Sequence, residues 1–325
     1  MAIDFNTVFN INSEQEFNKV AIEVYEFQKH NIPVYGDFVN NLKINKIKHY
    51  SQIPFLPIQF FKSHQIIKPA TNPDIIFSSS GTTGTQTSKH FVQNVDWYIK
   101  SYRKAFAHFY GDIADICMIA LLPNYLERDG SSLIYMIDDL IQQSKHPDSG
   151  FLLYEHDILF EKLNRLKKSG QKTILVGVTY ALLDFIEKHQ LNFPELIVME
   201  TGGMKGKRKE MVREELHQAL CNGFGVENIH SEYGMTELLS QAYSFGKGVF
   251  KSPNWMKILI RDINDPLTTL TNNKTGGINV IDLANIYSCS FIATQDLGKV
   301  LSHNTFEVLG RFDNSDIRGC NLLVG

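Results

Sequence analysis

The sequence predicts an α/β protein with a largely parallel sheet, and two observations carry this prediction. Short apolar stretches typical of buried strands alternate with longer segments in which apolar residues recur at helical spacing. This alternation is typical of parallel strands that are connected through helices. Glycine-rich loops follow several of the expected strands, at the carboxyl ends where α/β proteins usually bind their ligands.

The amino-terminal part is expected to be helical and then irregular. Ser13 and Glu16 form a capping-box pattern ahead of apolar residues at helical spacing, which continue to Phe27. Pro33 is expected to end this helix, because proline lacks the N–H that a continuing helix needs. The stretch 54–61 is apolar but interrupted by proline, so it predicts an ordered loop.

The rest of the chain supplies the alternating elements. Strands are expected at 74–77, 116–122, 173–178, 196–200, 256–261, 278–282 and 290–293, and helices near 96–110, 180–189 and 207–220. We expect a single domain over residues 1–325, which has a helical and loop lead-in over 1–70. An α/β core that binds nucleotide follows over 71–245, and a β-rich distal subdomain occupies 246–325.

Composition excludes several classes of protein. The chain has 325 residues, of which 43% are hydrophobic and 21% charged, as in ordinary globular proteins. A formal net charge of -3 gives no general attraction to nucleic acid. No apolar run approaches the roughly 20 residues that cross a bilayer, and the amino terminus lacks the pattern of a secretory signal. We therefore expect a cytoplasmic protein without a membrane span.

The 4 cysteines are widely scattered, and none forms a Cys-x-x-Cys pair. This spacing predicts neither a zinc site nor a disulfide framework. The thiols are expected to be reduced, which leaves open whether one of them is a nucleophile.

The first segment suited to chemistry is the Ser/Thr/Gly loop that begins at Ser78 and ends at Lys89. Glycines let backbone N–H groups converge on an anion, hydroxyls add donors, and a lysine neutralises phosphate charge. The Walker A pattern is absent, because Gly84 is followed by threonine and glutamine rather than lysine. A flexible surface loop is the alternative interpretation.

The second segment is Glu-Tyr-Gly-Met-Thr-Glu, which spans Glu232 to Glu237. Its tyrosine can stack on a purine, its threonine can bond a phosphate oxygen, and a carboxylate can hold the magnesium that accompanies ATP. Further segments contain Asp296, an acceptor for ribose hydroxyls, and Arg311, which can reach ribose or phosphate. Taken separately, each of these segments could be an ordinary surface turn.

In this order, the segments resemble the motifs of the adenylate-forming superfamily, which includes acyl-CoA synthetases, peptide-synthetase adenylation domains and luciferases. Within it, the chain is most similar to the acyl-protein synthetases of bacterial bioluminescence, which activate a fatty acid for an aldehyde-forming complex. The resemblance covers Ser78 to Cys320. It implies an adenylate-forming large-domain fold, with parallel and mixed sheets flanked by helices, that uses ATP and Mg²⁺.

The resemblance also assigns roles to the residues of the first two segments. Tyr233 is expected to stack on adenine, Thr236 to contact a phosphate and Glu237 to bind magnesium, with Glu232 and Gly234 beside them. The residues assigned to the ATP phosphates are Ser79, Ser80, Gly81, Thr82, Thr83 and Gly84, and those assigned to the loop that lines the adenine site are Gly202 and Gly203.

The later segments and the carboxyl terminus also have counterparts in the family. Asp296 matches the ribose-binding aspartate, and Arg311 matches the arginine of the following motif. Relatives continue beyond that motif into a small mobile domain whose lysine contacts the reacting carboxylate. This domain is expected to be absent here, so we consider Lys89, Arg311 and Arg318 as replacements for that lysine.

Three positions depart from the common pattern. Lys89 lies five residues after Gly84, whereas the family lysine lies three residues after the last glycine of its loop. Glu232 stands where many relatives have an asparagine that contacts adenine, and Gln295 replaces the glycine that usually precedes the ribose aspartate.

Acyl-protein synthetases pass the acyl group to a cysteine near the carboxyl terminus and then to a partner reductase. Cys320 lies five residues from the end, and Arg318 can lower the pKa of its thiol. A small buried residue is the alternative for Cys320, and Cys289 is the second choice of acceptor.

The sequence therefore predicts a ligase that activates a carboxylic acid, in particular a fatty acid, as its acyl-adenylate and transfers it to a protein cysteine. An acyl-CoA ligase is the first alternative, and a nucleotide-binding scaffold without catalysis is the second. Expected partners are the small-molecule acid and an acyl-acceptor protein or reductase.

Overall fold

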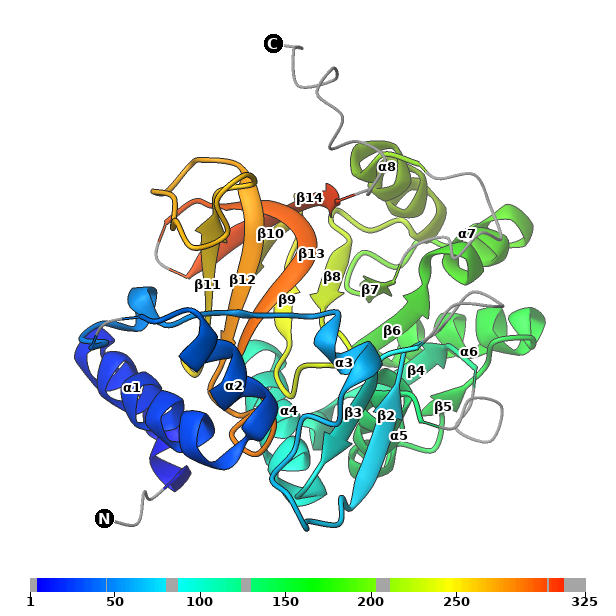
Figure 1. Ribbon diagram of the computed structural model, residues 1–325. Coiled ribbons are helices and arrows are strands. Elements are labelled where there is room, and N and C mark those ends of the chain that lie inside the picture. Colours follow the sequence, from blue (N-terminus) through cyan, green and yellow to red (C-terminus); the bar gives the residue numbers. More distant parts are fainter. Residues whose placement is uncertain are drawn as a thin grey trace. The chain divides into compact units, whose positions relative to one another are not determined.

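The computed structural model describes residues 5–44, 46–79, 87–123, 130–202, 211–302 and 304–312. The chain divides into two compact units, and each is described by itself (Figure 1). Unit 1 consists of Met1–Thr71 and Asn254–Gly325, and unit 2 consists of Asn72–Pro253.

Unit 2 contains the parallel sheet that the sequence predicts. Its strands lie in the order β10-β9-β8-β7-β6-β4-β5, and β4, β5, β6, β7 and β8 are parallel to one another. Their bounds are Cys117–Leu121 (β4), Gly150–Phe151 (β5), Thr173–Val178 (β6), Ile197–Thr201 (β7) and His230–Tyr233 (β8). Ala242–Ser244 (β9) and Val249–Lys251 (β10) continue the sheet in antiparallel fashion. Every residue of β4 and β6 is buried, as expected for strands that are covered on both faces.

Helices and one hairpin complete unit 2. The helices are Val95–Tyr110 (α4), Ile113–Asp115 (η3), Ser132–Ser144 (α5), His156–Ser169 (α6), Thr179–Lys188 (α7) and Arg213–Phe224 (α8). The hairpin consists of Ile75–Ser78 (β2) and Lys89–Val92 (β3), which pair with each other. Neither α5 nor α6 is predicted from the sequence above, although Ser131 caps α5 and buried apolar residues recur along both helices.

Unit 1 combines amino-terminal helices with an antiparallel sheet. The first part contains Phe5–Asn10 (η1), Glu14–Asn31 (α1), Pro33–Asn41 (α2), Tyr50–Gln52 (η2), Leu56–Pro57 (β1) and Phe60–Ser63 (α3). The sheet contains Met256–Arg261 (β11), Gly276–Asp282 (β12), Phe291–Val300 (β13) and Thr305–Arg311 (β14) in chain order, and β1 pairs in parallel with β13.

Three details of unit 1 bear on the predictions. The Ser13 side chain caps α1 by accepting from the backbone N–H of Glu16, as the sequence predicts. Pro33 ends that helix but also occupies the first turn of α2, because the first turn has no need of the N–H that proline lacks. The stretch 54–61, predicted as a loop, contains the short strand β1 and the start of α3.

No helix among the described residues combines the length and the apolar character that crossing a membrane requires.

Candidate active site

The predicted phosphate loop connects the two strands of the β2–β3 hairpin in unit 2. At its base, the backbone N–H of Ser79 donates to the carbonyl oxygen of Ser88 over 3.1 Å. The backbone N–H of Ser88 donates in return to Ser79 Oγ over 2.9 Å. These bonds close the loop where it leaves the hairpin. The predicted phosphate contacts Ser80, Gly81, Thr82, Thr83 and Gly84 lie outside the described residues.

The second predicted segment begins with Glu232 and Tyr233, the last two residues of β8, and none of its residues is exposed. Tyr233 is 9% exposed, and its ring meets the Phe250 ring edge-on, with 5.9 Å between centroids. Thr236 is half-buried, and Glu237 is only 5% exposed. A carboxylate this deeply buried needs hydrogen bonds or a cation to offset its loss of hydration.

A buried histidine joins these two segments. His90 lies in β3, directly after Lys89, the last residue of the predicted Ser/Thr/Gly loop, and its side chain is fully buried. Its Nδ1 lies 2.8 Å from the carbonyl oxygen of Thr236. Because a carbonyl only accepts, Nδ1 carries the proton and donates. The phosphate-loop hairpin and the Tyr233–Glu237 segment are thereby held together within unit 2.

Glu232 connects the ends of two neighbouring strands. Thr201, the last residue of β7, donates its hydroxyl to Glu232 Oε2 over 2.8 Å. The carboxylate also folds back over Gly234, where a Cβ atom would overlap Glu232 Oε1. Burial raises the pKa of the Glu232 carboxyl to about 7, although the Thr201 hydrogen bond acts in the opposite direction. Glu232 is therefore a group that titrates near neutral pH inside the predicted adenine site.

The turn after β7 also has a defined geometry. Gly202 adopts a φ of +62°, which glycine reaches without steric cost. The Thr179 hydroxyl at the start of α7 donates to its carbonyl oxygen over 2.8 Å. Gly203, the other predicted glycine of this loop, lies outside the described residues.

His230 is enclosed by aromatic side chains. Its Nδ1 lies 3.2 Å from the Tyr110 hydroxyl, and the Phe245 ring meets its imidazole edge-on at 5.2 Å. Burial lowers the pKa of His230 to about 4. The imidazole is therefore neutral at pH 7, which favours a structural role over a catalytic one.

In unit 1, the antiparallel pairing of β13 and β14 places the two remaining predicted residues opposite each other. Asp296 is the register partner of Arg311, and Arg311 Nε lies 3.4 Å from Asp296 Oδ1. The Arg311 side chain is 73% exposed, whereas that of Asp296 is 13% exposed. An ion pair with one exposed partner contributes little to stability, but this pair holds the Asp296 and Arg311 side chains next to each other.

Lys89, predicted as a cation near the phosphates, pairs with Ser78 in the hairpin and is exposed. Side chains alternate across a strand, so Lys89 projects to the face opposite buried His90. Its predicted contact with phosphate stays a prediction. Cys320 and Arg318 lie outside the described residues.

The three cysteines within the described residues are free thiols. Burial raises the pKa of Cys117 to about 11 and that of Cys289 to about 12. Cys221 is half-buried, and burial also raises the pKa of its thiol. Because the thiolate is the nucleophile, this argues against Cys289, the second choice of acyl acceptor.

Magnesium fits this donor set in one specific way. The described residues contain no group of three His, Cys, Asp or Glu side chains that could hold a metal ion. Mg²⁺ is, however, commonly held by one or two carboxylates together with substrate phosphates. Glu237 suits binding of Mg²⁺ by one carboxylate and substrate phosphates, because its carboxylate is buried. The neighbouring Thr236 backbone also connects it to the phosphate-loop hairpin.

One residue of unit 1 was not predicted from the sequence. Arg261 ends β11, and its Nη2 donates to the carbonyl oxygen of Thr294, two residues before Asp296, over 2.6 Å. The only sequence signal is an arginine at the end of an apolar strand, which is equally typical of a surface position.

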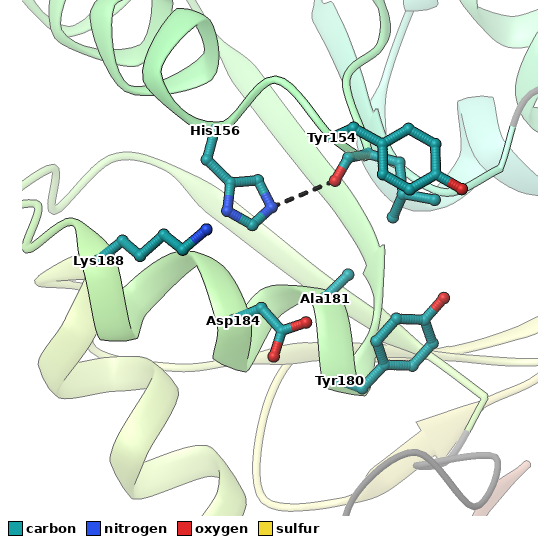
Figure 2. A pocket seen from close by; sticks show the side chains of 7 residues that line it. Tyr154, His156, Tyr180, Ala181, Asp184 and Lys188 are labelled. Atoms are coloured by element: carbon teal, nitrogen blue, oxygen red, sulfur yellow. Dashed lines mark hydrogen bonds between the residues drawn. The ribbon is translucent and has the colours of Figure 1, made fainter.

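A pocket of about 350 Å³ lies elsewhere in unit 2, and none of the predicted residues lines it. Figure 2 shows Tyr180, Asp184 and Lys188 on one side of α7, opposite His156 at the start of α6. His156 Nε2 donates to the carbonyl oxygen of Leu153 over 3.2 Å. We assign the candidate active site by the contacts of the motif residues rather than by this pocket.

Comparison of folds defines the class of protein. MatB from Rhodopseudomonas palustris, solved with ATP, shares the fold with a TM-score of 0.57 at 14% identity, over 74% of this chain and 48% of that chain. An open conformation of 2-hydroxyisobutyryl-CoA ligase, solved with 2-HIB-AMP and CoA, matches with a TM-score of 0.65 at 10% identity, over 93% and 75%. MenE from Bacillus subtilis, solved with ATP and magnesium, matches with a TM-score of 0.51 at 17% identity, over 73% and 49%. This chain therefore has the fold of adenylate-forming ligases and spans about half the length of MatB and MenE.

The family follows from the sequence profile of the acyl-protein synthetases (LuxE), which matches residues 133–325. The chain belongs to this family. No curated protein sequence matches it. The family and the fold confirm the predicted resemblance, the fold class and the prediction of an enzyme from the adenylate-forming ligases.

Proposed function

We propose that this protein uses ATP and Mg²⁺ to activate a fatty acid as its acyl-adenylate and then transfers the acyl group to Cys320. Membership of the acyl-protein synthetase family supports this proposal. The structural observation that carries it is the hydrogen bond from His90 to the Thr236 carbonyl. That bond joins the two segments of unit 2 to which nucleotide phosphates and magnesium are assigned.

Activation begins when the acid carboxylate attacks the α-phosphate of ATP, which forms the acyl-adenylate while the bond to the β-phosphate breaks and pyrophosphate leaves. Negative charge then gathers on phosphate oxygens, so catalysis depends on clustered donors and on positioning more than on a strong base. The 79–84 loop supplies backbone and hydroxyl donors, and the Thr236 hydroxyl supplies another. Magnesium held by Glu237 would neutralise phosphate charge.

The nucleoside is assigned to other residues. Tyr233 and the glycines after β7 are proposed to line adenine, with Glu232 beside them. In unit 1, Asp296 is proposed to accept the ribose hydroxyls, and Arg311 to contact ribose or phosphate. Lys89, Arg311 and Arg318 are our candidates for a cation near the reacting carboxylate.

Transfer requires a nucleophile. The Cys320 thiolate would attack the acyl carbonyl carbon, forming a thioester bond while the bond to the phosphate oxygen breaks and AMP leaves. The raised pKa values of the described thiols make them poor alternatives. A protein acceptor or reductase would then take the acyl group, and we propose that the reaction takes place in the cytoplasm.

CoA is the alternative acceptor, and one observation favours it. The ligase solved with 2-HIB-AMP and CoA matches 93% of this chain in fold. A thioester on free CoA, rather than on the protein, would identify that activity.

The test is acid-dependent exchange of labelled pyrophosphate into ATP, run across acids of increasing chain length. The wild type is compared with Cys320→Ser and with the control Cys221→Ser. We expect exchange to peak with long-chain acids and to survive both substitutions, while covalent acyl labelling disappears only in Cys320→Ser. Absence of exchange with every acid would contradict the adenylation proposal, and labelling that survives in Cys320→Ser would contradict the assigned acceptor.

A further inference from the structure

The segment that carries Asp296 is a bulge in β13. Gly277 of β12 pairs with Leu297 and Asn279 pairs with Ala293, so one residue of β12 faces three residues of β13. Residues 294–296 leave the regular ladder with β12 at this point, while Asp296 stays paired with Arg311 of β14. Bulges often re-aim a side chain beside a functional site.

A bulge leaves backbone carbonyls without ladder partners, and a side chain satisfies them here. Arg261 Nη1 donates to the carbonyl oxygen of Ile278 over 2.7 Å and to Asn279 Oδ1 over 2.9 Å. Arg261 Nη2 donates to the carbonyl oxygen of Thr294 over 2.6 Å. The planar guanidinium thus bridges the two strands where their own hydrogen bonds are interrupted, a geometry that a lysine ammonium cannot reproduce.

The bulge is also connected directly to Asp296. The Thr294 hydroxyl donates to the Ile278 carbonyl oxygen over 2.9 Å and accepts from the Asp296 backbone N–H over 3.1 Å. Arg261 and Asp296 are therefore linked through Thr294.

The guanidinium occupies a space that the surrounding residues leave for it. A Cβ atom on Gly277 would overlap the Arg261 guanidinium carbon, so a side chain at this position would displace the guanidinium. On another side, the guanidinium carbon lies 5.5 Å from the centre of the Phe312 ring. The Phe312 backbone N–H donates to the carbonyl oxygen of Gln295 over 2.7 Å, which joins the residue after Arg311 to the same bulge.

We propose that Arg261 is a positioning residue that orients the Asp296 carboxylate toward the ribose hydroxyls of ATP. This inference rests on the proposed function, because it assumes that Asp296 accepts those hydroxyls. Arg261 acts through the bulge and does not touch the nucleotide.

The experiment measures affinity for ATP and for dideoxy-ATP, which lacks both ribose hydroxyls, by calorimetry. Variants are Arg261→Lys, Gly277→Ala, which displaces the guanidinium without removing it, and Asp296→Asn. Lys257→Met is the control, since Lys257 lies in the same unit, pairs with Glu14 and lies 4.8 Å from the Phe17 ring centre, away from the bulge.

We expect the wild type to prefer ATP over dideoxy-ATP, and Arg261→Lys and Gly277→Ala to lose about ten-fold in ATP affinity, as expected for one charge-assisted hydrogen bond. Affinity for dideoxy-ATP should change less than two-fold, and Arg261→Lys should add nothing to Asp296→Asn. Lys257→Met should melt at a lower temperature while keeping the preference.

The outcomes separate the two proposals. If the wild type binds neither nucleotide, the proposed function fails. If Asp296→Asn loses the preference but Arg261→Lys and Gly277→Ala retain it, the positioning role is wrong while the proposed function stands. Equal loss of affinity for both nucleotides in the Arg261 and Gly277 variants would also contradict the positioning role, because such a loss would indicate a general structural effect.

Discussion

Two ionisable side chains on one face of β8 have pKa values shifted in opposite senses. His230 and Glu232 are two residues apart and therefore project to the same face. Burial lowers the pKa of His230 from 6.5 to about 4 and raises that of Glu232 from 4.5 to about 7. Both groups are consequently driven toward their neutral forms, which limits the charge held beneath the predicted adenine site.

We predict that Glu232→Gln changes stability in a pH-dependent way. The folded protein holds the Glu232 proton more tightly than the unfolded chain, so the ionised carboxylate destabilises the fold above pH 7. Relative to wild type, the variant should be more stable above pH 7 and lose this advantage as the pH falls from 7 to 4.5. At its steepest, the difference changes by about 1.4 kcal/mol per pH unit.

The measurement is thermal melting of both proteins across this pH range. His230→Asn provides a comparison of opposite sign, because the unfolded chain protonates His230 before the folded protein does. Its stability relative to wild type should rise as the pH falls from 6.5 to 4. A Glu232→Gln difference that does not vary with pH would show that this carboxyl does not titrate near neutrality.

We predict that Gly234→Ala destabilises the protein by about 1–3 kcal/mol, the usual cost of overpacking. The added methyl group would overlap the Glu232 carboxylate. Because the clash is with that side chain, the same substitution in a Glu232→Ala background should cost clearly less. Urea unfolding of the four proteins gives the coupling, and additive effects would contradict the proposed contact.

At the scale of elements, the site of unit 2 depends on a contact between a hairpin and a strand end. The β2–β3 hairpin forms a 2-stranded sheet of its own, separate from the sheet that contains β4 to β10. Its Ser78 backbone N–H donates to the carbonyl oxygen of Gly130 over 2.7 Å, and His90 contacts the Thr236 carbonyl oxygen. These bonds supply polar anchors for the loop that is proposed to bind phosphate.

We predict that His90→Phe raises the KM for ATP by about ten-fold. The substitution leaves the buried Thr236 carbonyl without this donor, which costs on the order of 1–3 kcal/mol. His90→Asn is the matched variant, because its amide nitrogen can replace Nδ1 and should recover most of the wild-type KM. Pyrophosphate exchange at varied ATP concentration measures both, and equal KM values for the two variants would contradict the role of the hydrogen bond.

At the scale of the whole molecule, each unit contains a buried cysteine whose reactivity can be used to follow the unfolding of that unit. Cys289 lies in unit 1 and Cys117 in unit 2, and both side chains are fully buried. Cys221 is half-buried in unit 2. Burial and the raised pKa values both slow the reaction of a thiol with an alkylating reagent.

We predict that Cys117 and Cys289 resist alkylation in the native protein, while Cys221 reacts first of the three. In increasing urea, the two buried thiols should become reactive at the same concentration, because we propose that the chain is one domain. Pulsed alkylation followed by peptide mass analysis measures each site separately. Two well-separated transitions would instead show that the units unfold independently.

Much of the fold could be predicted because its signals are local. The strand at 173–178 was predicted with the bounds that β6 has, and the Ser13 cap of α1 was visible in the sequence. Both depend on residues a few positions apart. The short strands β5 and β9 were not predicted, because their 2 and 3 residues carry no usable periodicity.

In the candidate site, too, the features that depend on local sequence could be predicted and those that depend on distant contacts could not. The order of the motifs was sufficient for the family, and residue types alone indicated that Tyr233, Thr236, Glu237, Asp296 and Arg311 could serve a nucleotide. The partners of these residues were not accessible from local patterns. His90 and Thr236 are 146 positions apart, and Arg261 and Thr294 are 33 positions apart. Such contacts, and the pKa values that burial produces, depend on which distant segments pack together, and that packing exists only once the chain has folded.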